Sequence, residues 1–382
     1  MVNQEKIELL KQYFKNEADN SHERAIFVGA GASVFLDIKS WEQLLKDMND
    51  FFKASIPVEE KIFEIGYPKM ASLIYNGNKT GEETSEAYKN FMENQFNPRT
   101  CHHYSLHTKI WTVFDLILTT NFDIAFESAL SDLNDFLFSM GNSKKKLETQ
   151  KLPDFDFSKI KSDATLVYLH GHKETGAYVF RKEEYDLHYQ SLLTSTSSRS
   201  DLERFLENVF RKITLLFIGF SFNDSYFIKF FKRTIKDFEI QKSNFEKVHG
   251  QRYPSELPLY MAILHEKSLQ THAMKSEVEE IFNDDKSWHD LFEDHNEDKL
   301  LFKQDTLKIV DGLSIDMKTK RKIRYYYNKI EENKRRRIDL EELNMEIIVV
   351  DDYNCTEDIL NLLKMEESGI VDEEDAKYAT VL

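Results

Sequence analysis

Six short runs of apolar, often β-branched residues recur along the chain, and each ends at glycine or polar side chains. The runs are "AIFVGA" from residue 25, "DLILTTNFD" from 115, "ATLVYLHGH" from 164, "ITLLFIGFSFND" from 213, "LPLYMAILH" from 257 and "MEIIVVDDY" from 345. Apolar runs of this length, bounded by turn residues, are typical of strands buried on both faces. The pattern therefore predicts six strands.

Helical spacing of apolar residues dominates between these runs. Residues 1–20 predict an amphipathic helix, and so does much of 58–113. The segment "SWEQLLKDMNDFF" begins at Ser40, a suitable N-cap, and Gln43 stands where it would complete a capping box. Buried strands that alternate with helices indicate a Rossmann-like α/β fold, with a parallel sheet covered by helices on both faces.

The alternation of strands and helices is interrupted once, and this interruption suggests how the chain is divided into parts. We expect an N-terminal helix over 1–23, a core over 24–266, and the final strand and helix of the core with a C-terminal tail over 345–382. The stretch 267–344 lacks strand-like runs, so we expect a helical insertion or accessory module there. Polar residues follow each strand, at the edge where open parallel sheets bind their ligands.

Composition and charge narrow the function classes. The chain has 382 residues, 41% of them hydrophobic, which is enough for a sizeable core. Its net charge of −16 opposes direct binding to nucleic acid. The basic run 318–337 is an exception that fits a solvated helix face, or docking onto an acidic partner or nucleic acid.

Cysteine and histidine content gives no support for a metal site. Two cysteines form neither a disulfide framework nor a four-cysteine zinc site. His103 and His107 stand four residues apart, as in some zinc sites, but no further ligand lies at the usual short spacing. A helix that leads into the second strand explains them better. With no apolar segment long enough to span a bilayer, we expect a cytoplasmic protein.

The turn after the first strand is rich in small residues. It consists of Gly29, Ala30, Gly31, Ala32 and Ser33. A P-loop would need a lysine after the last glycine, and a dehydrogenase fingerprint would need a third glycine where this chain has valine. What remains is a turn whose backbone N–H groups can approach a diphosphate, although a tight strand-to-helix connection would use the same residues.

The strand ends "GAGAS", "TTNFD", "HGH" and "GFSFND" occur in the order and context of the sirtuin-like NAD-binding family. More closely, the chain resembles the bacterial sirtuin-like effectors of antiphage defence. It departs from protein-deacylating sirtuins because no cysteine, and hence no zinc ribbon, occurs in 171–214. In the run "FLDIKSW", Asp37 and Lys39 replace the family's glycine and proline, which leaves the cover of the nicotinamide end open.

The resemblance implies a role for three polar residues. Asn121 would hold the ribose hydroxyls and a water, because an amide both donates and accepts without charge. Asp123 would support the nicotinamide pocket or offset positive charge on the sugar. His170 would be the general base. Each also has a structural reading, since Asn and Asp often cap helices and most histidines are structural.

Four further positions complete the implied site. Thr120, Gly219 and Ser221 would contact the ribose and phosphates, together with the small-residue turn. Asp224 is the acid typical of this branch, and a helix cap explains it equally well. The acidic pair at 351–352 is a weaker candidate for adenosine contacts.

Together these features predict an NAD hydrolase that forms nicotinamide and ADP-ribose without a metal and depletes NAD during phage infection. The resemblance also implies a homo-oligomer and a HerA-like hexameric ATPase as a partner. Two alternatives remain open. The first is a protein deacylase or ADP-ribosyltransferase, and the second is a non-catalytic NAD- or ADP-ribose-binding scaffold in a nucleic-acid complex.

Overall fold

A computed structural model of the chain describes residues 8–10, 23–96, 104–160, 164–173, 175–193, 198–265, 317–350 and 353–367. The expected N-terminal helix over 1–23 falls outside this set, apart from a helical turn at 8–10 and the residue that begins the first strand. The acidic pair at 351–352 and His103 also lie outside it.

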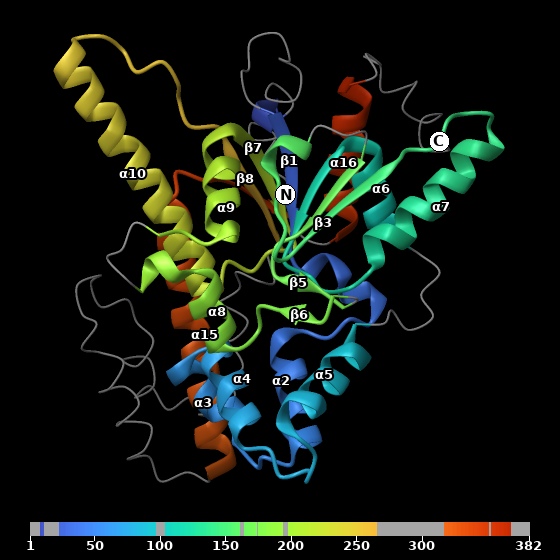
Figure 1. Ribbon diagram of the computed structural model, residues 1–382, viewed down its shortest axis with the longest axis vertical. Helices are drawn as coiled ribbons and strands as arrows, with labels where there is room; N and C mark the ends of the chain where they lie inside the picture. The colour runs from blue at the N-terminus through green and yellow to red at the C-terminus, as the bar shows by residue number, and fades with distance from the viewer. Residues whose placement is uncertain are drawn as a thin grey trace, which may run out of the picture.

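Seven parallel strands form the central sheet, in the order β3-β4-β2-β1-β7-β8-β9 (Figure 1). They are β1 (Glu23–Val28), β2 (Leu116–Thr119), β3 (Leu147–Lys151), β4 (Ala164–Tyr168), β7 (Ile213–Ile218), β8 (Tyr260–His265) and β9 (Glu346–Val350). A separate two-stranded hairpin pairs β5 (Gly171–His172) with β6 (Ala177–Tyr178). The sheet confirms the predicted α/β class.

Helices surround the sheet and extend beyond it. They are α2 (Trp41–Phe52), α3 (Val58–Ile65), α4 (Tyr67–Asn76), α5 (Thr84–Gln95), α6 (Ser105–Val113), α7 (Ala125–Ser139), α8 (Lys182–His188), α9 (Asp201–Lys212), α10 (Ser225–His249), α15 (Met317–Glu342) and α16 (Tyr353–Glu367), with 3-10 turns η1 (Ala30–Leu36), η2 (Phe157–Lys159) and η3 (Gln190–Leu192). No helix among the described residues is both long enough and apolar enough to cross a membrane.

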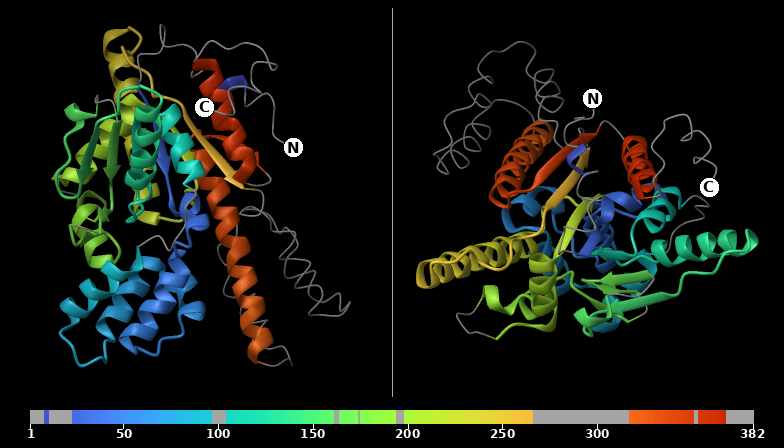
Figure 2. Two further views of the ribbon diagram at one scale, coloured as in Figure 1. Left: turned by 90° about the vertical axis from the view of Figure 1, so that its right-hand side faces the viewer. Right: turned by 90° about the horizontal axis from the view of Figure 1, so that it is seen from above.

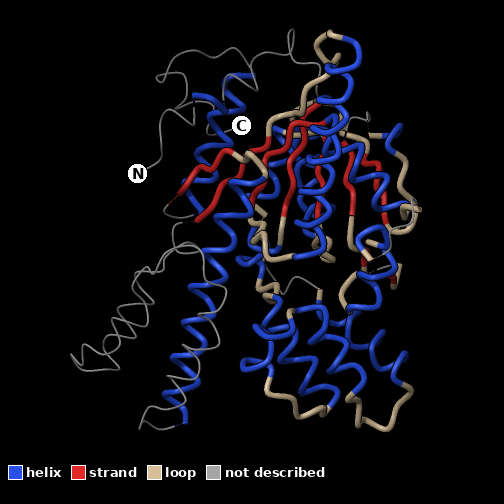
Figure 3. Tube along the Cα trace, turned by 90° about the vertical axis from the view of Figure 1, so that its left-hand side faces the viewer, coloured by secondary structure: helices blue, strands red, loops and turns tan. Residues whose placement is uncertain are grey.

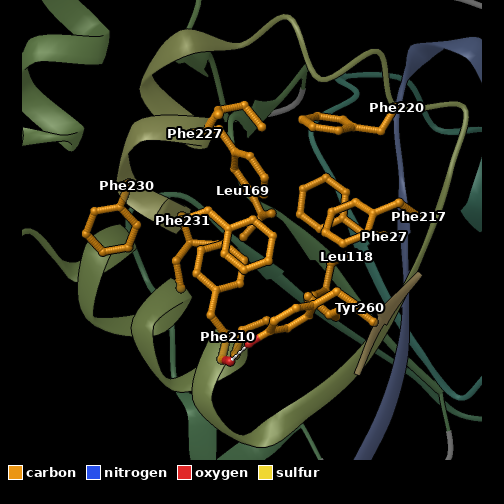
Figure 4. Packing of buried hydrophobic residues seen from close by; sticks show 14 of the residues in the cluster. Phe27, Leu118, Leu169, Phe210, Phe217, Phe220, Phe227, Phe230, Phe231 and Tyr260 are labelled. Carbon is orange, nitrogen blue, oxygen red and sulfur yellow. Dashed lines mark hydrogen bonds between the residues drawn. The ribbon is translucent and has the colours of Figure 1, made fainter. Parts of the chain in front are cut away.

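Each face of the sheet has its own hydrophobic core. Side chains alternate along a strand, so Ala25 and Phe27 of β1 enter one core while Ile26 and Val28 enter the other. Helices α6, α7 and α16 cover the second face, and α8, α9 and α10 cover the first (Figure 2). The first core is rich in aromatic rings that pack around Phe27 (Figure 4).

Helices α2 to α5 form a separate layer, here called the cap, beyond one end of the sheet (Figure 3). The cap has its own core of buried residues. An aromatic stack of Trp41 on Phe180, which follows β6, joins the cap to the rest of the fold with ring centroids 4.5 Å apart. A hydrogen bond of 2.6 Å from Ser72 to Glu183 of α8 adds a second link. Half of the predicted capping box is present at the first helix of the cap. The Ser40 hydroxyl accepts from the Gln43 N–H, but the Gln43 side chain donates to Asp47 instead of returning to residue 40.

Candidate functional site

The tips of β1 and β7 touch each other through their backbones, where the order of strands reverses. The Gly29 N–H donates to the Ile218 carbonyl at 3.0 Å, and the Gly31 N–H donates to the Gly219 carbonyl at 2.8 Å. A Cβ atom on Gly29 would lie 2.6 Å from the Gly219 oxygen, so no larger residue fits. The glycines of this turn are therefore required by the contact between two loops, and their N–H groups are engaged inside the fold.

A cavity of about 370 Å³ opens at these strand tips, within the size range of small-molecule sites. Most of the residues predicted from the sequence line it: Ala30, Gly31, Thr120, Asn121, Asp123, His170, Gly219, Ser221 and Asp224. Three predicted residues, Gly29, Ala32 and Ser33, do not line it and lie behind its wall. The structure thus brings the four strand tips to one cavity.

Asn121 is held by a short relay of buried polar groups. Its Nδ2 donates to the Ser33 hydroxyl at 3.2 Å and to the Gly29 carbonyl at 3.4 Å. The Ser33 hydroxyl lies 3.2 Å from Nε2 of His107, on α6. Burial lowers the pKa of His107 to about 4, so its imidazole is neutral near pH 7. With Nδ2 committed to the fold, the Oδ1 atom is the part of the amide left to accept from a ligand.

Asp123 is a buried carboxylate at the cavity wall. Its Oδ1 accepts from the Ala125 N–H at 2.9 Å, at the start of α7, as the cap reading of this residue predicts. Its Oδ2 is buried without a hydrogen-bond partner among the described residues. Burial raises the pKa of Asp123 to about 6, and the nearby Glu127 carboxylate raises it further. An unpaired buried oxygen of this kind suits a ligand that brings a donor or a positive charge.

His170 lies among two tyrosines and a carboxylate. Its Nε2 is 3.0 Å from the Tyr189 hydroxyl and 3.8 Å from Oδ2 of Asp224. Burial lowers the pKa of His170 to about 3, and the charge of His188 adds to this. The ring is therefore neutral at physiological pH, with a carboxylate close enough to stabilise it when it takes a proton.

Asp224 serves two purposes at once. Its Oδ1 caps α10 by accepting from the Tyr226 and Phe227 N–H groups, each at 3.0 Å. Its Oδ2 accepts from the Tyr185 hydroxyl at 2.9 Å, on the side of the cavity. Burial raises the pKa of Asp224 to about 6. The cap reading and the site reading of this residue are thus compatible.

Residues 115–281 match the family described as SIR2-like domain. The chain is therefore similar to the SIR2-like family over somewhat less than half of its length. It is also 30% identical over 219 residues to the protein named NAD(+) hydrolase ThsA of Cytobacillus dafuensis. That alignment covers 56% of this chain and 38% of ThsA, so the chain spans well under half the length of this relative. These matches confirm the sirtuin-like resemblance drawn from the strand tips.

The SIR2-like match includes Asn121, Asp123 and His170, and it leaves out the lining residues that come from the cap and from α15. The cap supplies several of those residues, among them Trp41 and Tyr67. The run after η1, where the family's glycine and proline are replaced, also lines the cavity at residues 38–42. The cap and this run therefore form part of the cavity wall.

Two residues of the basic run 318–337 also line the cavity, Lys329 and Arg336 of α15. The charge run fits a solvated face or a docking surface, and the burial of Arg336 contradicts the solvated face for this residue. The only available signal was their seven-residue spacing, which places them on one side of a helix. Within the described part of the chain, no group of three or more His, Cys, Asp or Glu side chains is placed to hold a metal ion.

Proposed function

We propose that this chain hydrolyses NAD to nicotinamide and ADP-ribose. The proposal is carried by one observation: Asn121 and Asp123 from the tip of β2 and His170 from the tip of β4, all within the SIR2-like match, line a single cavity. The name of the relative ThsA, an NAD(+) hydrolase, supports it. The reaction breaks the bond between the nicotinamide nitrogen and the ribose carbon C1′. The electron pair leaves with nicotinamide, and a water oxygen bonds to C1′.

The surroundings of Asn121, Asp123 and His170 suit each residue to a different role in the reaction. Oδ1 of Asn121 accepts from a ribose hydroxyl or from the attacking water, because Nδ2 is held by Ser33 and Gly29. The unpaired Oδ2 of Asp123 offsets the positive charge that develops on the sugar. His170 accepts the proton of the water, and Asp224 then stabilises the imidazolium from 3.8 Å.

Release of nicotinamide from NAD by the purified protein tests this function. We expect turnover by the wild type and a loss of roughly a hundredfold or more in kcat for Asn121→Ala and for His170→Ala. His249→Ala, at an exposed histidine where α10 ends, is a matched control and leaves turnover unchanged. Turnover that survives both site variants would overturn the assignment, and NAD binding without turnover would favour a scaffold.

We further propose that this activity depletes NAD during phage infection, and that self-assembly or a HerA-like ATPase regulates it by releasing the chain from an inactive resting state. The basis is the resemblance to antiphage effectors, since unchecked NAD hydrolysis would kill the host. The expected result is that nicotinamide release by the isolated chain rises several-fold when a co-purifying partner is added or when the chain assembles. Size-exclusion chromatography coupled to the turnover assay measures it.

A further inference from the structure

Helix α15 joins the cap to the core and passes the cavity between them. At the cap, Tyr325 packs edge-on against Phe63, with ring centroids 5.6 Å apart, and its hydroxyl donates to Glu42 at 3.4 Å. At the core, Lys232 of α10 forms ion pairs with Asp339 and Glu342, near the end of α15. Figure 2 shows the helix lying alongside both layers. Two anchors of this kind hold the middle of α15 in place at the cavity.

Lys329 and Arg336 point from that middle section into the cavity wall. Arg336 is 7% exposed, a degree of burial that arginine reaches only where something compensates its charge. Burial lowers the pKa of its guanidinium, while Glu332 one turn earlier and Tyr67 of the cap act in the opposite direction. Lys329 lies 3.1 Å from the same Glu332. Two of the three described lysine and arginine side chains that line the cavity thus belong to α15 and lie near one carboxylate.

Outside α15, the described lining offers a diphosphate polar groups such as Thr120 and Ser221, but no lysine or arginine other than Lys39. The N–H groups of Gly29 and Gly31 donate within the fold, and Asp123, Asp224 and Glu42 add negative charge to other parts of the lining. A third lining cation, Lys39, is paired with Asp47 and donates to Gln95 at 2.9 Å. An anionic ligand in this cavity therefore finds its compensating charge at α15.

We propose that Arg336, with Lys329 beside it, binds the phosphate groups of the dinucleotide and of its ADP-ribose product. This inference rests on the proposed function and adds a phosphate-binding element that lies outside the SIR2-like match. A planar guanidinium contacts two phosphate oxygens at once, so Arg336 selects ligands that carry a diphosphate. Because Arg336 belongs to α15, ligand affinity then depends on how α15 packs against the cap and the core.

Calorimetric binding of ADP-ribose and of adenosine to the full chain separates this role from packing. We expect Arg336→Gln to weaken ADP-ribose binding by roughly ten- to a hundredfold and to leave adenosine binding unchanged. Arg336→Lys restores part of the loss. Arg337→Gln, the next residue and exposed, is the matched control and binds both ligands as the wild type does. If Arg336→Gln does not fold, Lys329→Gln replaces it, with a smaller loss for ADP-ribose alone.

The outcomes distinguish the two proposals. A wild type that hydrolyses NAD, with an Arg336→Gln variant that binds ADP-ribose normally, overturns only the role of α15. Equal losses for ADP-ribose and adenosine also overturn it, because they indicate a packing effect. A wild type that neither hydrolyses NAD nor binds ADP-ribose contradicts the proposed function itself.

Discussion

At the scale of single residues, the amide of Asn121 is useful only in one orientation. The amide group can rotate by half a turn and exchange its donor and acceptor. Ser33 and Gly29 prevent that by accepting from Nδ2, and His107 in turn fixes the Ser33 hydroxyl from 3.2 Å. His107 does not line the cavity and reaches Asn121 only through Ser33, so it is a positioning residue.

Replacement of His107 therefore affects the rate more than substrate binding. We expect His107→Leu to lower kcat by about tenfold, the value of one lost orienting hydrogen bond, with KM for NAD nearly unchanged. His107→Gln keeps a polar atom within reach of Ser33 and retains most of the rate. Steady-state kinetics with thermal melting as a folding control measures this. A purely structural role predicts that both variants lose activity only as far as they lose stability.

A sequence contains no signal for this relay. Ser33 and His107 are 74 positions apart, and their contact exists only because η1 and α6 pack at the same strand tip. The regular spacing of His103 and His107 instead pointed to a zinc site or a plain helix. By contrast, Asn121 and His170 follow directly after apolar strands, so their convergence at one edge of the sheet was predictable from the chain.

Asp123 illustrates a buried charge that the hydrogen bonds of the fold compensate only in part. Burial raises its pKa from 3.8 to about 6, so the folded protein gains from this group below pH 3.8 and loses the gain as pH rises through about 6. At neutral pH the carboxylate costs stability on the order of 3 kcal/mol. A protein keeps a destabilising buried carboxylate of this kind mainly at functional sites.

The variant Asp123→Asn tests this balance. Asn can still accept from the Ala125 N–H, and it carries no charge to bury. We expect it to be more stable than the wild type by up to about 3 kcal/mol at about pH 7.5, with a much smaller difference near pH 4.5. Its kcat falls by at least tenfold. Urea unfolding at the two pH values and nicotinamide release measure the two effects; a variant that is less stable at both contradicts the burial argument.

At the scale of elements, the contact between the β1 and β7 tips sets the shape of the site. Gly219 has a φ of 63°, and a Cβ there would lie 2.3 Å from the Ala32 nitrogen. Gly250, at the end of α10, has the same φ of 63° but open space around its Cβ position. Substitution of Gly250 therefore reports only the free-energy cost of a left-handed backbone, whereas substitution of Gly219 also reports the cost of the close contact between the strand tips.

Alanine at each position measures the two costs. Gly250→Ala adds only conformational strain, about 1 kcal/mol. Gly219→Ala adds a clash with backbone that cannot move without opening the strand tips, and we expect it to cost several kcal/mol more and to abolish turnover. Urea denaturation and nicotinamide release measure both. Equal effects of the two substitutions would show that the tips separate easily.

The elements that the sequence missed have a common physical reason. The edge strand β3, "LETQK", pairs only with β4, and Gln150 is its one fully buried residue. An edge strand covered so little needs no apolar run, so hydrophobic pattern cannot reveal it. The five interior strands were predictable because burial on both faces forces an apolar composition. The other edge strand, β9, was predictable because its sequence is apolar, although it is only partly buried.

At the scale of the whole molecule, charge is distributed unevenly between the surface and the cavity. The chain carries a net charge of −16, and its most basic segment contributes two cations to the cavity wall. The basic run is plain in the sequence. The sequence does not show which of its side chains face the cavity, because α15 has cations on more than one side. Only the packing of the helix between the cap and the core decides it.

This distribution predicts that the isolated chain does not bind duplex DNA. The exposed cations of α15, such as Arg335 and Arg337, are too few to overcome the repulsion between phosphates and an acidic surface. We expect a dissociation constant no smaller than about 10⁻⁴ M for a short duplex near physiological salt, which is the weak limit of non-specific DNA binding. Fluorescence anisotropy over a salt series measures it. Micromolar affinity that falls steeply with salt, and that is removed by Arg335→Glu together with Arg337→Glu, would assign the outer side of α15 to nucleic acid. In that case the helix would serve two ligands from opposite sides, with Arg336 still facing the cavity.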